Sequence, residues 1–477
     1  MSLLKKIYSS VPLKFNEISR FLLISLMMLM ILFIYSIQRN IKDAIIVSDI
    51  SAEIIPTIKL WVVTPLAVLF LFFYAQISNS LNKTVIFHIL NLFFISYFLF
   101  FAFVIQQNLG LFHFNLGLES FKEGDHFFKY FILVLENWSY VVYFAFAELW
   151  GSVMLGLMFW QIANQVFRVD ESKRLYPLFG LLAQFGLFLS SFVIKFSKYL
   201  TKSWEQQLVI INICVAIAAI ILSLTFKLLY STVVKVDDIN AETTRRKRKM
   251  SLSEGLKHVF TSKYIGLIAV LIICYGVSMN LVEVLWKAQI SAIYSDKSKY
   301  SNYIANSQIY IGMASMIIML LGSYVLRLVS WRVAATINPI IIGITGLFFF
   351  AFTVFKDHLY LAISFFSISP LSFTIAVGLI QNVLSKSTKY AFFDATKEMA
   401  YIPLDNDLKS KGKAAAEVIG GRFGKGGGSF ILWFLLGMPN TTAESITPIV
   451  FFIFIFIIVI WFFSIRSLSL KFDKKTS

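Results

Sequence analysis

Long apolar runs alternate with short polar breaks along almost the whole chain of 477 residues. A helix needs about 20 apolar residues to cross the roughly 30 Å of hydrocarbon in a bilayer, and each run is long enough to do so. The predicted spans are 20–46, 57–77, 84–106, 130–167, 175–200, 205–230, 262–290, 300–328, 332–355, 358–404, 413–438 and 444–468. The pattern predicts an all-α integral membrane protein with twelve transmembrane helices, of which the tenth is overlong.

The first six spans resemble the last six at a constant offset of 240 residues. The matching positions are Tyr35, Asn40, Ile41 and Asp43 with Tyr275, Asn280, Leu281 and Glu283, and Lys173, Gly180 and Gly186 with Lys413, Gly420 and Gly426. A parallel repeat of this kind is typical of major-facilitator-like transporters, whose central cavity lies between two six-helix halves. We expect an N-terminal bundle over 1–230, a cytoplasmic basic linker over 231–260 and a C-terminal bundle over 261–477.

Composition agrees with the membrane class, because 58% of the residues are hydrophobic and only 14% are charged. The two cysteines, Cys214 and Cys274, lie inside apolar runs, which argues against a disulfide framework or a metal site. No small-residue cleavage site follows the apolar run at 21–37, so we expect that run to be kept as the first helix.

The formal net charge of +17 has three explanations: nucleic-acid binding, contact with anionic lipid, or a cavity for an anionic solute. The longest basic run, 245–249, is a short linker, and no soluble basic domain is present, so we expect no nucleic-acid partner. Basic residues near the start, after the fourth span, in the linker and at the end predict by the positive-inside rule that both termini are cytoplasmic. Lys195, Lys198 and Lys202 fall on the predicted outer side and depart from that rule.

The end of the first span carries the first group of candidate site residues. Arg39 and Asp43 are four residues apart and can pair on one helical face, with Lys42 projecting beside them. Charged side chains that extend from a helix end toward water would show the same pattern. The repeat-related helix favours a buried role, because Asn280 and Glu283 lie well inside the seventh span.

Glu148 is the second candidate, since it is the only charged residue between Asn137 and Arg168. A lone carboxylate within a membrane span must be protonated, paired or facing water. It is therefore either a group that couples protons or substrate to transport, or half of a structural ion pair with a buried lysine.

The third candidate region, 385–428, concentrates charge and glycine in an apolar chain. Its charged residues include Lys386, Lys389, Asp394, Lys397, Glu398, Lys413, Glu417, Arg422 and Lys425. The basic groups would converge on a cavity, where lysine acts as a point charge and arginine as a two-pronged donor to phosphate. The GGRFGKGGG run is not a P-loop, because Ile419 and Gly426 stand where that motif requires glycine and Ser or Thr.

Catalytic motifs are not evident in the sequence. The histidines are dispersed, and neither an HExxH motif, a Cys/His cluster nor a GxSxG turn is present. We therefore expect a protein that is not an enzyme and holds no cofactor or metal, and a membrane-embedded transferase is the more distant alternative.

Several long stretches resemble the nucleotide transporter family typified by the ATP/ADP translocases of obligate intracellular bacteria and plant plastids. They are RNIKDAIIVSD, AELWGSVMLGLMFWQIANQ, RLYPLFGLLA, FTSKYIGLIAVLIICYGVSMNLVEVLWK, IQNVLSKSTKYAFFDATKEMAYIPLD and KGKAAAEVIGGRFGKGGG, which together extend over about residues 20–465. The resemblance implies a twelve-helix exchanger that moves nucleotides without hydrolysing them. We expect it to act as a monomer in the bilayer of a bacterial inner membrane and to take up ATP in exchange for ADP.

The resemblance also implies which charges serve transport. The family's four important charged positions correspond to Lys42, Glu148, Glu283 and a lysine that is either Lys397 or Lys389. The predicted polyphosphate site comprises Lys42, Lys397, Arg422, Lys389, Lys425 and Arg39, with Asn280 nearby and the carboxylates Glu148 and Glu283 balancing the cations in the empty state.

At two places this sequence departs from the family's usual motifs, and both departures bear on the identity of the substrate. GKGGGSF stands where a GKSGGA-like sequence is usual, and Gln289 stands where a basic residue is frequent. Members of the family also carry GTP, CTP, UTP or NAD, some of them with protons. A proton-coupled importer or exchanger of other nucleotides is therefore the alternative within the class.

Overall fold

The computed structural model describes residues 17–118, 128–167, 169–232, 262–356, 358, 368–404 and 413–476, and every regular element in these ranges is helical. The first half contains α2 (Ile18–Asp49), η2 (Ala52–Ile54), α3 (Ile55–Ile58), η3 (Lys59–Val63), α4 (Thr64–Ser80), α5 (Lys83–Phe100), η4 (Phe101–Ile105), η5 (Gln106–Asn108), α6 (Leu109–Phe112), α8 (Lys129–Glu136), α9 (Trp138–Trp150), η6 (Gly151–Phe159), α10 (Trp160–Val166), α11 (Val169–Leu200) and α12 (Trp204–Thr232). The second half contains α15 (Lys263–Ile293), α16 (Lys297–Leu328), α17 (Trp331–Val354), α19 (Pro370–Thr388), η7 (Lys389–Phe393), α20 (Asp394–Tyr401), α21 (Lys413–Leu436) and α22 (Thr447–Thr476).

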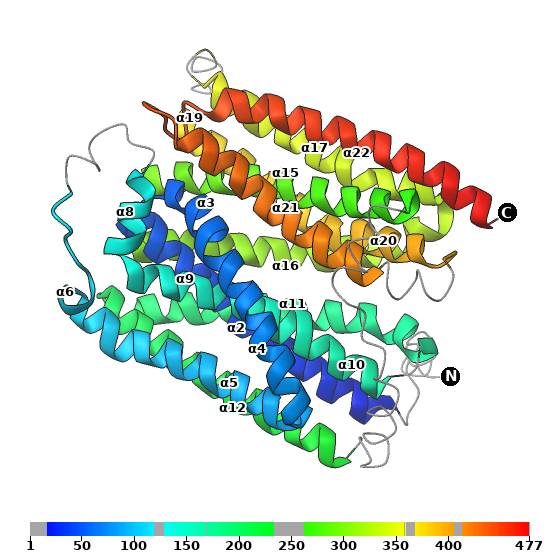
Figure 1. The fold of residues 1–477 in the computed structure, drawn as a ribbon, viewed down its shortest axis with the longest axis horizontal. Coiled ribbons are helices and arrows are strands. Elements are labelled where there is room, and N and C mark those ends of the chain that lie inside the picture. The colour runs from blue at the N-terminus through cyan, green and yellow to red at the C-terminus, as the bar shows by residue number, and fades with distance from the viewer. Residues whose placement is uncertain are drawn as a thin grey trace.

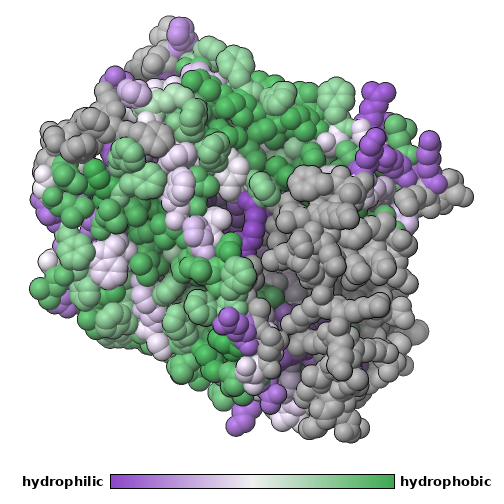
Figure 2. Space-filling view, viewed as in Figure 1, coloured by the Kyte–Doolittle hydropathy of each residue, from purple (hydrophilic) through white to green (hydrophobic). Residues whose placement is uncertain are grey.

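The long helices lie side by side, and α2 begins at the same end of the bundle at which α22 finishes (Figure 1). We call this the terminal end, and we call the other, where α2 finishes at Asp49, the opposite end. Hydrophobic side chains cover much of the face shown in Figure 2, and hydrophilic ones occupy a recess near its centre. This is the surface expected of a bundle that is surrounded by lipid.

Ten helical stretches within the described ranges are long and apolar enough to cross a membrane. The other two predicted spans correspond to α19–η7–α20 and α21, which pack into the same bundle but carry most of the charges of the region 385–428. The all-α, twelve-span prediction is thus confirmed, and the two polar spans are those that we expected to face a cavity.

Two of the predicted spans need comment. The predicted span 130–167 is interrupted at Asn137, where α8 has ended and before α9 begins. Within the described part of the overlong span 358–404, α19 starts at Pro370, where the Ser369 hydroxyl accepts a hydrogen bond from the backbone N–H of Ser372. Proline suits a first helical position, so it defines this start. Residues 359–367 lie outside the described ranges.

The two halves repeat each other in packing as well as in sequence. In the first half α2 packs against α11 and α12, and in the second α15 packs against α21 and α22. The fourth span of each half contains a π-helical segment, η6 in the first half and η7 in the second. The two segments correspond in the repeat, because Gly151 of η6 and Ala391 of η7 are 240 residues apart. The proposed linker 231–260 falls almost entirely outside the described residues, so the domain boundaries remain a prediction.

The halves meet along a polar seam between α2, α11 and α16. The Ser36 hydroxyl donates to Gln308 Oε1 at 2.8 Å, and the Ser190 hydroxyl lies 2.8 Å from that of Ser36. Asn40 on α2 donates to the backbone carbonyl of Ser301 at 2.9 Å and accepts from its hydroxyl at 2.6 Å. Buried polar groups that are paired in this way hold the two halves in one register.

Close glycine packing joins α15 to α21. A Cβ atom added at Gly276 would lie 2.7 Å from the Cα of Gly424, whereas one added at Gly421 would meet nothing within 4 Å. Such contacts let two helix backbones approach closely in a membrane. They also bring the Lys425 backbone carbonyl of α21 within hydrogen-bond distance of Asn280 on α15.

We predict that Gly276→Ala lowers thermal stability, because the new methyl group would press on the backbone of α21. Overpacking of this kind costs about 1–3 kcal/mol. Gly421→Ala is the matched control, and we expect it to be neutral or slightly stabilising because alanine favours helix more than glycine does. Thermal unfolding of the purified variants in detergent measures both, and equal melting temperatures would contradict the packing argument.

Candidate functional site

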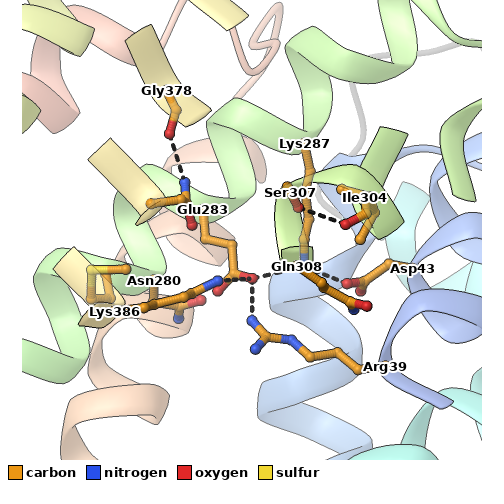
Figure 3. A network of polar contacts seen from close by, with 12 residues as sticks. Arg39, Asp43, Asn280, Glu283, Lys287, Ile304, Ser307, Gln308, Gly378 and Lys386 are labelled. Atoms are coloured by element: carbon orange, nitrogen blue, oxygen red, sulfur yellow. Dashed lines mark hydrogen bonds and ion pairs between the residues drawn. The ribbon is translucent and has the colours of Figure 1, made fainter. Parts of the chain in front are cut away.

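A network of ion pairs lies between the two halves of the bundle. Its members come from α2, η3, α9, α15 and α19, and several are shown in Figure 3. The side chains are Arg39, Lys42, Asp43, Lys59, Glu148, Asn280, Glu283, Lys287 and Lys386. Charges at this depth are tolerated only if they are paired or reached by water.

Lys42 is the most deeply buried cation of the network, with 1% of its side chain exposed. Its Nζ lies 2.8 Å from Asp43 Oδ1 and 3.0 Å from Glu148 Oε1. The same nitrogen lies 3.8 Å from the centre of the Phe144 ring, close enough for a cation–π contact. Two carboxylates and an aromatic ring therefore stabilise its charge, and Glu148 is paired in this structure.

Asp43 bridges the two halves. Its Oδ1 contacts Lys42 on the same helix, and its Oδ2 lies 2.8 Å from the Nζ of Lys287 on α15. We expected Asp43 to pair with Arg39 four residues earlier, and that expectation is wrong. Arg39 instead pairs with Glu283, because α15 presents a carboxylate to it across the interface.

Glu283 is the common acceptor of three cations. Its Oε1 pairs with Arg39 Nη2 and lies 3.3 Å from Lys287 Nζ and 3.7 Å from Lys386 Nζ (Figure 3). Lys287 is one helical turn from Glu283, so it can contact both this carboxylate and Asp43. The carboxylates of the two repeat-related positions, Asp43 and Glu283, are thus linked by one lysine.

Asn280 connects the network to α21 and to the second span. Its Oδ1 accepts from Lys59 Nζ at 3.0 Å, and its Nδ2 donates to the Lys425 backbone carbonyl at 2.9 Å and to the Ser429 hydroxyl at 2.7 Å. Ser429 belongs to GKGGGSF, one of the two motifs that depart from the usual family sequence. The other departure, Gln289, donates to Thr353 on α17 at 2.9 Å.

Cations outnumber carboxylates in this network. Among the described residues that form it, five side chains are basic and three are acidic: Arg39, Lys42, Lys59, Lys287 and Lys386 against Asp43, Glu148 and Glu283. Lys59 contacts the neutral amide of Asn280. Lys386 Nζ comes no closer than 3.7 Å to Glu283 Oε1, an oxygen that already pairs with two other cations. The arrangement therefore has spare capacity for an anion.

Lys389 and Lys397 form a second cluster with Asp394 and Glu417. Lys389 Nζ lies 2.8 Å from Asp394 Oδ2, and Lys397 Nζ lies 2.8 Å from Glu417 Oε1. Lys389 also lies over the rings of Tyr275 and Tyr390. Two cations and two anions balance here, and this group follows Lys386 toward the terminal end of the bundle.

Arg422 and Lys425 lie on α21, and Lys425 is close enough to Glu148 for the two charges to attract each other. Arg422 is half-buried and Lys425 is exposed, and neither makes an ion pair within the described part of the chain. Lys425 is nevertheless beside the network, since its backbone carbonyl accepts from Asn280. Both remain accessible to a solute.

The structure brings Arg39, Lys42, Glu148, Asn280 and Glu283 together and places the remaining predicted side chains in the second cluster and on α21. Sequence analysis did not select Lys59 or Lys287, and it named Lys386 only as one of the charges of the third candidate region. Lys287 had a usable signal in its four-residue spacing from Glu283. Lys59 had none, because a lone lysine near a helix start is usually interfacial.

Comparison with known proteins assigns the family. A sequence model described as TLC ATP/ADP transporter matches residues 3–472. The chain is 39% identical over 472 residues to ADP,ATP carrier protein 1 of Rickettsia bellii, an alignment that covers 97% of this chain and 95% of that protein. It is 38% identical over 489 residues to ADP,ATP carrier protein 3 of the same organism, covering 97% and 96%.

Solved structures agree on the fold. The chain superposes with a TM-score of 0.57 on a bacterial homologue of the iron transporter ferroportin in an inward-facing state, at 11% identity and with 98% of this chain and 100% of that one covered. A D-xylose–proton symporter also gives 0.57, at 11% identity and with coverage of 92% and 97%. The fold is major-facilitator-like, and this multi-pass membrane protein belongs to the TLC ATP/ADP transporter family.

Proposed function

We propose that this protein exchanges ATP for ADP by alternating access and takes ATP across the inner membrane of a bacterium. The observation that carries the proposal is the surplus of cations in the network between the halves. Family membership supports the nucleotide as the solute, and the curated relatives are named ADP,ATP carrier proteins.

The surplus cations suit a polyphosphate. Within the described residues Lys59, Arg422 and Lys425 form no ion pair, and Lys386 shares the Glu283 carboxylate with two other cations. Arg39 retains partial exposure beside Glu283. A charge-assisted hydrogen bond contributes about 1.5–3 kcal/mol, so a few of them bind a nucleotide well. The bound phosphates would compete with Glu148 and Glu283 for Lys42 and Arg39.

That competition provides a reason for exchange. When phosphate leaves, Glu148 and Glu283 pair again with Lys42 and Arg39, so only the surplus cations of the network stay without a carboxylate. A site of this kind binds the entering and the leaving nucleotide through the same groups. Tight binding in one facing state alone would stall turnover, so comparable affinity in both states is required.

Contacts at the opposite end close the path between the halves. Glu53 accepts from the Ala443 backbone N–H at 2.6 Å and from the Tyr130 hydroxyl at 3.0 Å. The Trp61 and Trp433 rings meet edge to face, with their centres 5.4 Å apart. Alternating access requires these contacts to open.

Orientation is inferred from charge. Arg466, Lys471 and Lys474 toward the end of α22 fit a cytoplasmic terminal end under the positive-inside rule. In this orientation the state closed at the opposite end would offer the site to the cytoplasm. The lysines Lys195 and Lys198 would then lie on the outer side.

Obligate exchange predicts that uptake depends on internal nucleotide. We expect proteoliposomes loaded with ADP to accumulate labelled ATP at least ten times faster than empty ones. Equal initial rates would exclude exchange and favour the proton-coupled alternative. Dissipating a proton gradient across the empty vesicles tests that alternative directly.

Two lysines should be necessary for uptake. We predict that Lys42→Ala and Lys397→Ala each abolish ATP uptake without loss of expression, because each removes a cation from a charge cluster, a buried one at Lys42 and a partly buried one at Lys397. The control is Lys195→Ala, which removes an exposed lysine at the opposite end. Normal uptake by either of the first two variants would remove that residue from the proposed phosphate site.

A variant at Lys386 tests the contribution to nucleotide binding separately from structural ion pairing. We expect Lys386→Ala to weaken ATP binding about tenfold or more through loss of one charged contact, while the network keeps its shorter pairs. Lys356→Ala is the matched control, because it breaks a peripheral pair with Glu444, which is largely exposed. Competition by unlabelled ATP against labelled ATP measures the affinity, and equal affinities would contradict the assignment.

A further inference from the structure

A groove on the outside of the bundle carries two arginines. It lies between α17 and α22 near the terminal end, has a volume of about 280 Å³, and is lined by Arg332, Thr336, Val459, Phe462, Phe463, Ile465 and Arg466. The two helices are neighbours along the upper edge of Figure 1. Neither the transport network nor the second charge cluster shares a residue with this groove.

Packing on both sides of the groove explains why it is there. Toward the middle of the bundle the helices are close, because a Cβ added at Gly343 would lie 3.3 Å from Ile458 and one added at Gly346 would lie 2.3 Å from Phe454. Toward the terminal end, Trp331 stacks on Phe472 with ring centres 5.1 Å apart. The groove is held open between these two contacts.

Both arginines stand at the boundary of an apolar span. Arg332 is the second residue of α17, and Arg466 is the first charge after the apolar run of α22. Both side chains are exposed, and within the described residues neither forms an ion pair. Two unpaired guanidinium groups at the level of the membrane surface form a site that is complementary to a phosphate diester.

An apolar track leads from the arginines into the bilayer. Val459 and Phe463 are exposed at the groove, and Phe456 continues their stripe on α22. From 466 to 456 the helix rises about 15 Å, which is half of the roughly 30 Å hydrocarbon thickness. The track thus has the length of one acyl chain in one leaflet.

We propose that this groove binds an anionic phospholipid, with its phosphate between Arg332 and Arg466 and an acyl chain along α22. The polar and apolar parts of the groove meet in the order in which a phospholipid presents its headgroup and its chain. A soluble anion would use only the arginines and would leave the apolar track uncovered. Hydrophobic side chains along this edge and hydrophilic ones at its terminal end are visible in Figure 2.

Lipid binding to the purified full-length protein tests the proposal. Native mass spectrometry with phosphatidylglycerol or phosphatidylethanolamine would compare the unchanged chain with an Arg332→Gln/Arg466→Gln double variant. We expect a preference for phosphatidylglycerol that the double variant loses by roughly 30-fold. The Arg332→Lys/Arg466→Lys variant should recover most of the binding, which shows that any loss is not misfolding.

A control at the same end removes the same charge outside the groove. Lys471→Gln/Lys474→Gln changes two basic residues farther along α22, and we expect it to keep the lipid preference. An equal loss of lipid preference in this control would show that surface charge alone explains the preference, and it would contradict the proposed lipid site. Equal binding of both lipids, or displacement of phosphatidylglycerol by millimolar inorganic phosphate or ATP, would also overturn it.

Discussion

The ion pair between Asp43 and Lys287 is the contact on which the centre of this molecule depends. Both side chains are almost fully buried, and each comes from a different half. A charge at this depth costs several kcal/mol unless a partner of opposite sign is present. The pair therefore fixes the relative position of α2 and α15, and the other charged groups are arranged around it.

Around this pair the charges are graded by exposure. Lys42, Asp43 and Lys287 are sealed from solvent, whereas Arg39, Glu148, Glu283 and Lys386 keep partial access. The buried pair of Asp43 and Lys287 provides structure, whereas the accessible groups can exchange partners, and Lys42 takes part in that exchange through its partner Glu148. A transporter needs both, because a solute must displace some ion pairs without dismantling the interface that holds them.

Three of the four π-helical segments in the described ranges lie at or next to charged positions of the two clusters, the exception being η4. Lys59 is the first residue of η3 and Lys389 is the first of η7, while η6 begins three residues after Glu148. The carbonyl of Lys59 accepts from the Thr64 hydroxyl at 2.8 Å, which compensates for the altered backbone pairing. π-helical segments are rare and are often found at functional sites. Their recurrence in the fourth span of both halves links the repeat to the site.

The sequence by itself determined the fold class, the twelve spans, the repeat and most of the charged positions that matter. These follow from local properties, since span length, hydropathy and a constant offset can be read along the chain. Tertiary structure alone decided the partners: Arg39 pairs with Glu283 across the interface, and Lys59 and Lys386 join from other helices. Pairing between helices far apart in sequence depends on their rotation and depth, and the short-range pattern around Arg39 and Asp43 carried no information about either.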